Sequence, residues 1–102
     1  MPEYTPKTLS ALTIQDIAAY IRLDELTEQD GEFLTTALAA SKAFILKYTG
    51  LAAAEADTKL DLTIAAYVLC QDMYDTRTLY VDNANVNKVV EAILGLHSVN
   101  LL

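Results

Sequence analysis

The absence of proline after Pro6 is the feature that most constrains what this chain folds into. Both prolines, Pro2 and Pro6, lie in the first six residues. A proline inside a helix removes a hydrogen bond and clashes with the preceding turn, so the rest of the chain is free to be helical. Residues 1–10 are expected to form a flexible arm, because chain ends without partners fray.

Threonine and aspartate recur three residues apart at three points where an apolar pattern begins. The pairs are Thr13 and Asp16, Thr27 and Asp30, and Thr58 and Asp61. A threonine hydroxyl accepts a hydrogen bond from a free N–H at a helix start, and an acid in the first turn suits the positive end of the helix dipole. Each pair therefore predicts the beginning of a helix.

Apolar side chains spaced three and four residues apart predict four helices. Their expected bounds are about 13–21, 30–49 and 59–76, with a last helix from Asn85 or Asn87 to about Leu96. The second helix ends at Gly50, which can take the left-handed conformation that closes a helix. Residues 51–58 are expected to be a linker, and residues 77–87 an irregular loop.

Residues 59–76 are apolar nearly all round a helix, which predicts that they form the central helix of a bundle. Ile64 is expected in the core, where a charged replacement would unfold the domain. The inward face of the last helix is expected to be Val89, Val90, Ile93 and Leu96. The sequence thus predicts one all-α domain over residues 1–102, a small bundle of four helices that ends in an apolar tail at 97–102.

The charge of the chain limits the classes of partner. Its formal net charge is −7 and its isoelectric point is about 4.4, with seven Lys and Arg residues, none adjacent to another. Binding nucleic acid through its phosphates needs clustered basic residues, so this class is excluded, and anionic membranes are disfavoured for the same reason. An acidic wall can instead repel DNA and let it slide past without sticking.

The single cysteine, Cys70, excludes a disulfide within the chain and favours a reducing compartment. Because it lies in the middle of a helix, it is expected to be a small core side chain. The N-terminus lacks the pattern of a signal peptide, and no stretch approaches the ~18 apolar residues of a membrane span. The sequence therefore predicts a soluble intracellular protein.

No arrangement of residues indicates a catalytic, cofactor or metal site. The acidic stretch 24–32 fails as a calcium loop because, with Gly31 at the sixth position, Leu26 and Ala37 would stand where oxygen ligands are needed. His97 is the single histidine, and nothing in the sequence places an orienting carboxylate beside it. We therefore expect a protein that is not an enzyme and carries no cofactor.

Protein contacts are expected at the loop and at the two ends of the chain. Tyrosine buries a large ring while its hydroxyl stays available, which suits interfaces that are partly wet. The candidate interface residues are Tyr4, Arg77, Leu79, Tyr80, Val81, His97, Leu101 and Leu102. For Tyr4 and Tyr80, a plain surface position remains the alternative.

The order of segments over roughly residues 9–100 is itself a pattern. It consists of a short helix "LTIQDIAAYIRLD", an acidic turn "ELTEQDGEF", a long helix closing in "AFILKYTG", the hydrophobic "DLTIAAYVLCQDMYDTR", an Asn-containing loop and a final "VEAILGLHSV". The most recognisable pieces are Tyr48-Thr49-Gly50 and the helix end Tyr74-Asp75-Thr76-Arg77. This order resembles the head–tail connector family of tailed phages, also called head-completion, adaptor or DNA-packaging proteins. One departure is His97-Ser98, where the family often has Tyr-Arg, so an arginine contact is not expected there.

The resemblance implies structural work and no catalysis. Copies would be monomeric when free and would form a ring, a dodecamer in the virion, beneath the portal protein at the head–tail junction. The ring would extend the DNA channel without binding DNA specifically and would offer a platform to a tail-side connector or stopper protein. Assembly would take place in the host cytoplasm. The alternative is a small acidic helical adaptor or regulatory module that binds a single protein partner.

Overall fold

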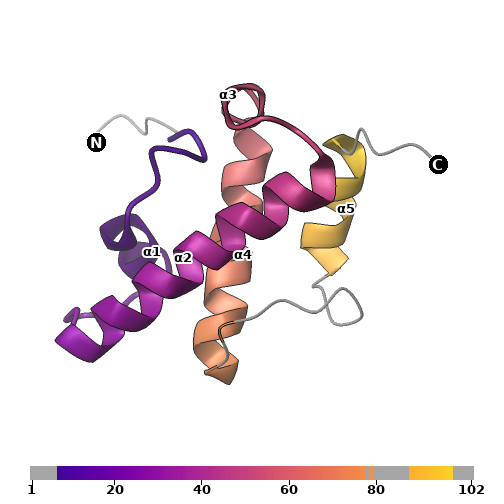
Figure 1. Ribbon diagram of the computed structural model, residues 1–102. Helices are drawn as coiled ribbons and strands as arrows, with labels where there is room; N and C mark the ends of the chain where they lie inside the picture. Colours follow the sequence, from indigo (N-terminus) through magenta and orange to yellow (C-terminus); the bar gives the residue numbers. More distant parts are fainter. Residues whose placement is uncertain (1–6, 78, 80–87, 98–102) are drawn as a thin grey trace, which may run out of the picture.

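Five helices make up the described part of the chain, residues 7–77, 79 and 88–97 of the computed structural model (Figure 1). They are α1 (Ile14–Tyr20), α2 (Glu28–Thr49), α3 (Ala53–Ala56), α4 (Leu60–Thr76) and α5 (Lys88–His97). These residues contain no strand, so the predicted all-α class is confirmed. The predicted number of four helices is one too few, because the expected linker 51–58 contains the single turn α3.

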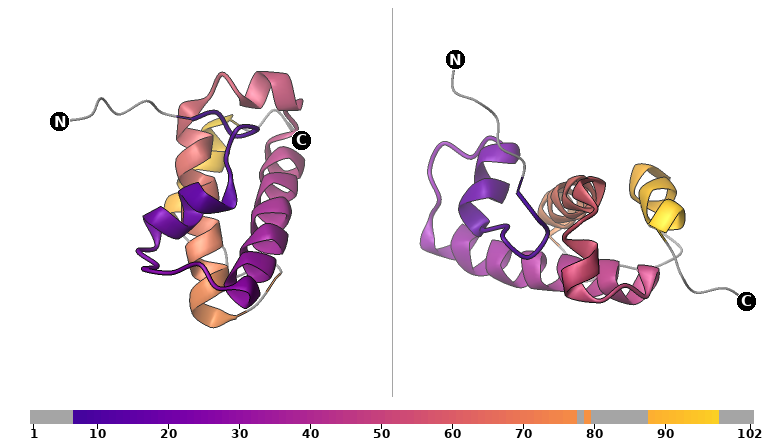
Figure 2. Two further views of the ribbon diagram at one scale, coloured as in Figure 1. Left: turned by 90° about the vertical axis from the view of Figure 1, so that its left-hand side faces the viewer. Right: turned by 90° about the horizontal axis from the view of Figure 1, so that it is seen from above.

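The helices are arranged in two layers. α2 forms one layer alone, and α1, α4 and α5 lie across it, with α4 between the other two (Figure 2). The contact between α2 and α4 is the most extensive one between helices of the described chain. The prediction that residues 59–76 form the central helix is therefore confirmed. Within the described residues, none of the helices combines the length and the apolar character needed to cross a lipid bilayer.

Two of the three predicted helix starts are confirmed. The Thr13 side chain accepts from the Asp16 backbone N–H, and the Asp16 carboxylate accepts from the Thr13 backbone N–H, so a complete capping box opens α1. At the start of α2, the Thr27 side chain accepts from the Asp30 backbone N–H. These caps satisfy backbone donors that no helical carbonyl can reach.

The third predicted cap is wrong, although the helix begins within a residue of the expected position. α4 begins after Lys59 and has no side-chain cap, although Asp61 lies in its first turn as expected. The Thr58 hydroxyl instead donates to the Glu55 carbonyl at 2.7 Å. Thr58 belongs to the turn that ends α3, where its backbone N–H also donates to the Glu55 carbonyl, so the N-cap position of α4 falls one residue later, at Lys59.

The core lies between α2 and α4. Its buried residues on these two helices are Leu34, Ala37, Leu38, Ser41, Ile45, Thr49, Leu62, Thr63, Ala65, Ala66, Leu69, Cys70 and Met73. The Cys70 thiol lies 3.4 Å from the Ser41 hydroxyl, and Cys70 is buried as predicted. Burial raises the pKa of the Cys70 thiol, and the hydrogen bond with Ser41 offsets part of this rise.

One side of α4 is open to solvent, and this corrects the prediction for Ile64. Ile64 is 51% exposed and Leu60 is 44% exposed. With α2 beneath and α1 and α5 on its flanks, α4 has a fourth side on which these residues lie. A charge at Ile64 is thus expected to be tolerated, whereas one at the fully buried Leu62 would unfold the domain.

The predicted inward face of α5 is right for Val90 and Ile93 and wrong for Val89 and Leu96. Val90 and Leu94 are completely buried, whereas Val89 and Leu96 are 56% and 78% exposed. Ile93 is partly buried and packs against the core. Apolar residues cover too wide an arc of this helix to be buried together. Only the side of α5 that contacts α4 and α2 is covered, and Val90 and Leu94 lie on that side.

The flexible arm was predicted over residues 1–10, but its last four residues are packed against the helices. Residues 1–6 lie outside the described residues, but Leu9 and Leu12 are only 2% and 4% exposed. Residues 7–10 therefore belong to the packed domain. We call residues 7–13, which lie against the helices and lead into α1, the N-terminal strap.

Left-handed backbone occurs at three described positions. Gly50, with φ of 74°, closes α2 as predicted, and its N–H donates to the Leu46 carbonyl. Arg22 and Arg77 have φ of 63° and 56°. A residue with a side chain is strained in this conformation by about 1–2 kcal/mol, a strain that glycine avoids.

Candidate interaction surface

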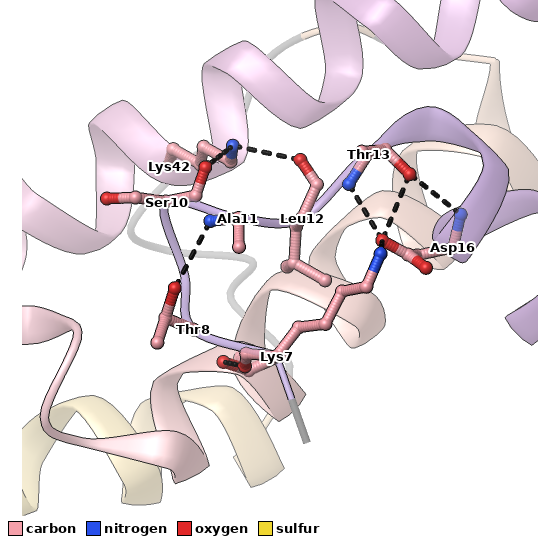
Figure 3. Close-up of polar contacts among 9 residues, drawn as sticks. Lys7, Thr8, Ser10, Ala11, Leu12, Thr13, Asp16 and Lys42 are labelled. Atoms are coloured by element: carbon pink, nitrogen blue, oxygen red, sulfur yellow. Dashed lines mark hydrogen bonds and ion pairs between the residues drawn. The ribbon is translucent and has the colours of Figure 1, made fainter. Parts of the chain in front are cut away.

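The ammonium group of Lys42 holds the N-terminal strap on α2. Its nitrogen donates to the carbonyl oxygens of Ser10 and Leu12, at 3.3 and 3.2 Å (Figure 3). A charged donor makes a stronger hydrogen bond than a neutral one, so one side chain satisfies two carbonyls that lie outside any helix. Lys42 is partly exposed on α2 and reaches the strap from there.

Two further hydrogen bonds fasten the N-terminal strap. The Thr63 hydroxyl of α4 donates to the Lys7 carbonyl at 2.7 Å. The Ser10 backbone N–H donates to the carboxylate of Asp57, at the end of α3, at 2.9 Å. Together with buried Leu9, these contacts attach the strap to α2, α3 and α4.

Asp16 links the N-terminal strap to α1. Its Oδ2 atom accepts from the Lys7 ammonium at 2.9 Å, and from the backbone N–H and the hydroxyl of Thr13 at 2.9 and 3.0 Å (Figure 3). Burial raises the pKa of this carboxyl, but the hydrogen bonds from Lys7 and Thr13 outweigh burial and hold the pKa below its ordinary value. A carboxylate is therefore fixed at the start of α1 at neutral pH.

A cluster around Tyr74 ties the end of α4 to the start of α2. The Tyr74 hydroxyl donates to the Asp30 carboxylate at 3.2 Å, and Phe33 meets the Tyr74 ring edge-on with centroids 6.0 Å apart. The Arg77 guanidinium lies over the same ring, 3.9 Å from its centroid. Arg77, a candidate interface residue, thus covers Tyr74 and closes α4, while the residue as a whole remains exposed.

An ion pair joins α5 to α4. The Nε2 atom of His97 lies 2.8 and 2.7 Å from the two carboxylate oxygens of Asp61. His97 ends α5 and Asp61 lies in the first turn of α4, so the two helices run antiparallel. Negative charge is favourable at a helix start, so the Asp61 carboxylate suits the first turn of α4. No pattern in the sequence predicted this carboxylate beside His97.

The exposed side of α4 faces away from α2. Tyr67 points to α1, where it stacks on Tyr20 with ring centroids 4.9 Å apart. Asp61 points to α5, where it meets His97. With 3.6 residues per turn, Ile64 lies between these two directions and opposite the buried side of the helix.

The exposed apolar residues of α5 face the same way. Around the axis of α5, Leu94, His97 and then Leu96 follow in order, with Val89 beside Leu96. α5 contacts α4 and α2. Because His97 points to α4, buried Leu94 lies on the side toward α2, and Leu96 and Val89 lie on the side away from it. We call Leu60, Ile64, Val89 and Leu96 together the outer apolar face.

The structure describes three of the eight candidate interface residues. Arg77 caps Tyr74, His97 pairs with Asp61, and Leu79 is 41% exposed. The other five lie outside the described residues: Tyr4, Tyr80, Val81, Leu101 and Leu102. These predictions stay untested.

The outer apolar face was missed because its members were assigned to the core. One signal was available in the sequence. Apolar residues surround nearly all of 59–76 and a wide arc of 88–97, which is more apolar surface than small neighbouring helices cover.

Comparisons of the chain with family models, with curated proteins and with solved structures found no match.

Proposed function

We propose that the protein is a structural ring-forming connector that joins the head of a tailed phage to its tail beneath the portal. The observation that carries this proposal is the outer apolar face. Large apolar side chains gathered on the exposed sides of two adjoining helices are typical of surfaces that contact other proteins. A ring needs such a surface, because each subunit contacts its neighbour through two different patches.

The order of the helices and the charge of the chain also support the proposal. The short α1, the long α2 that closes at Gly50, and the apolar α4 follow one another as in the family that the sequence resembles. A net charge of −7 suits a channel through which DNA passes without binding.

The test is assembly in the presence of the portal protein encoded by the same phage genome. Negative-stain microscopy and native mass spectrometry are expected to detect rings of this chain bound to portal. Ile64→Asp and Leu96→Asp are expected to abolish the rings while melting within a few degrees of the unchanged protein, because both positions are exposed. Ala43→Asp, which adds the same charge on an exposed position of α2, is the matched control and is expected to assemble.

The possible outcomes separate the function classes. Rings that form with portal and fail in the two face variants support the connector. A complex of one copy with one other protein, and no ring, would identify the adaptor instead. Monomers that never bind portal contradict the connector, as does unfolding of Ile64→Asp, which would place this side chain in the core.

A further inference from the structure

The N-terminal strap and α1 form a unit, residues 7–21, that the loop 22–27 joins to α2. Polar contacts, a ring contact and apolar packing in the core attach this unit to the remaining chain. The polar and ring contacts are Lys42 with Ser10 and Leu12, Thr63 with Lys7, Asp57 with Ser10, and Tyr67 with Tyr20. A second copy of the chain offers the same acceptors, donors and ring, so the unit of one copy fits on another with unchanged geometry.

The loop that holds the unit in place is strained. At the end of α1, the Leu23 N–H donates to the Ala18 carbonyl at 3.0 Å, and the Arg22 N–H donates to the Ala19 carbonyl at 3.2 Å. Helix ends with this hydrogen-bond pattern usually have glycine at the left-handed position. Here that position is Arg22, with φ of 63°, and its side chain makes the conformation unfavourable.

The same loop is able to become helical. Residues 22–27 read "RLDELT" and contain neither glycine nor proline. Arginine, leucine and glutamate favour helix, so opening the turn at Arg22 allows α1 to continue through the loop into α2. Opening releases the strain and moves the unit away from its own α2 and α4, which leaves their contact groups available to another copy. Short strained hinges are known to favour such exchange.

We propose that residues 7–21 of one copy dock on α2 and α4 of the next copy, with residues 22–27 as the hinge. This inference rests on the proposed function, for which it names one contact between subunits. The exchanged contact is heterologous, since each copy gives its unit to one neighbour and receives a unit from the other. A chain of such contacts closes into a ring when the rotation between copies allows it.

Cysteine pairing between two different variants tests the exchange. Ser10→Cys and Asp57→Cys are made in separate chains, mixed, denatured, refolded together at high concentration with and without portal, and then oxidised. A disulfide between the two variants is the expected result of exchange, because the hydrogen bond from the Ser10 backbone N–H to the Asp57 carboxylate makes these two residues neighbours. A single chain that carries both Ser10→Cys and Asp57→Cys is the control, because it shows whether the two thiols can form a disulfide within one copy. Cys70 is buried and its thiol has a raised pKa, so it does not compete.

Two changes in the hinge make the test quantitative. Arg22→Gly relieves the strain of the closed form and is expected to lower the yield of the mixed disulfide about five-fold, the factor that ~1 kcal/mol represents. Arg77→Gly makes the same change at the other left-handed arginine, outside the hinge, and is expected to leave the yield unchanged. Deleting the exposed Asp24 and Glu25 shortens the loop and is expected to give an obligate dimer or larger assembly with native helix content.

The outcomes distinguish this inference from the proposed function. A mixed disulfide that forms supports the exchange, with or without rings. Rings that form with portal while no disulfide joins the two variants, and a shortened loop that leaves a folded monomer, overturn the exchange and leave the connector in place. Exchange without rings keeps the inference about the hinge and counts against the connector. If the double variant forms no bond within one chain, sedimentation of the shortened-loop protein decides alone.

Discussion

The N-terminal strap and α5 are attached to the same α2–α4 core by different kinds of contact. The strap is not a regular helix, so Lys42, Thr63 and Asp57 pair with several of its carbonyls and N–H groups, in addition to the burial of Leu9 and Leu12. α5 satisfies most of its own backbone and is held by the buried side chains of Val90 and Leu94 and by one ion pair.

This difference follows from the need of every buried backbone N–H and C=O group for a hydrogen-bond partner. An irregular segment can be packed against a core only if its N–H and C=O groups find partners, which fixes its position closely. A helix brings its own partners and needs only an apolar contact, so its rotation depends on which side chains fit. Polar substitutions should therefore release the strap, and apolar truncations should release α5.

The largest effect is expected from truncation of the α5 contact. Leu94→Ala should lower the free energy of unfolding by about 2–4 kcal/mol, because this side chain is fully buried. Leu96→Ala, a matched change at a residue that is 78% exposed, should alter it by less than about 0.5 kcal/mol. Urea unfolding followed by circular dichroism measures both. Similar losses for the two variants would contradict the rotation of α5.

The next effect is expected from the ammonium group that holds the strap. Lys42→Met keeps most of the side chain and removes the donor to Ser10 and Leu12, so it should lower the free energy of unfolding by about 1–3 kcal/mol. Lys47→Met, at an exposed position of the same helix, is the control and should have little effect. Amide exchange near Leu12 should accelerate in the first variant only. Unchanged exchange there would show that Lys42 does not hold the strap.

A smaller and pH-dependent effect is expected at Asp16. Its pKa is lowered in the folded protein, so the carboxylate stabilises the fold above the ordinary aspartate pKa of about 3.9 and loses this contribution as the pH falls through the folded value. Asp16→Asn should therefore be less stable at pH 7 by about 1 kcal/mol, and the difference should shrink below about pH 4. Thermal unfolding between pH 2.5 and 7 measures this. A difference that stays constant over that range would contradict the lowered pKa.

The smallest effect is expected from the ion pair between α4 and α5. A double-mutant cycle of Asp61→Ala and His97→Ala should give a coupling of at most about 1 kcal/mol, because the Asp61 side chain is 39% exposed and solvent screens the pair. The cycle separates this coupling from the effect of Asp61 on the start of its own helix. A coupling well above this range would mean that α5 is held by polar contacts as the strap is.

Helix starts and stops could be predicted where the deciding atoms lie within four residues. The caps at Thr13 and Thr27 and the left-handed Gly50 are of this kind, and the structure confirms them. The cap at Thr58 failed because α3, a single turn with a weak pattern of its own, extends into a turn that includes Thr58 and moves the N-cap position of α4 to Lys59. Local reasoning fails when an unpredicted element shifts the first residue of the next one.

The surface could not be predicted in the same way. Ile64 and Leu96 are as apolar as the buried residues beside them, and no local contact marks them as exposed. The pairing of His97 with Asp61 and of Lys42 with Leu12 joins residues 36 and 30 positions apart. Such pairs depend on how the helices are arranged in space, and the spacing of apolar residues along the chain does not predict that arrangement.

The chain alone was enough to establish an all-α protein, the approximate extent of its four main helices, the central place of α4 and the burial of Cys70. Each of these depends on helical periodicity, on caps, or on the strong tendency of apolar segments to leave water. The open side of α4, the rotation of α5 and the packed strap became known from the arrangement of helices in space. A side chain loses water only when a neighbour covers it, and in this fold three helices cover three sides of α4 and leave the fourth open to solvent.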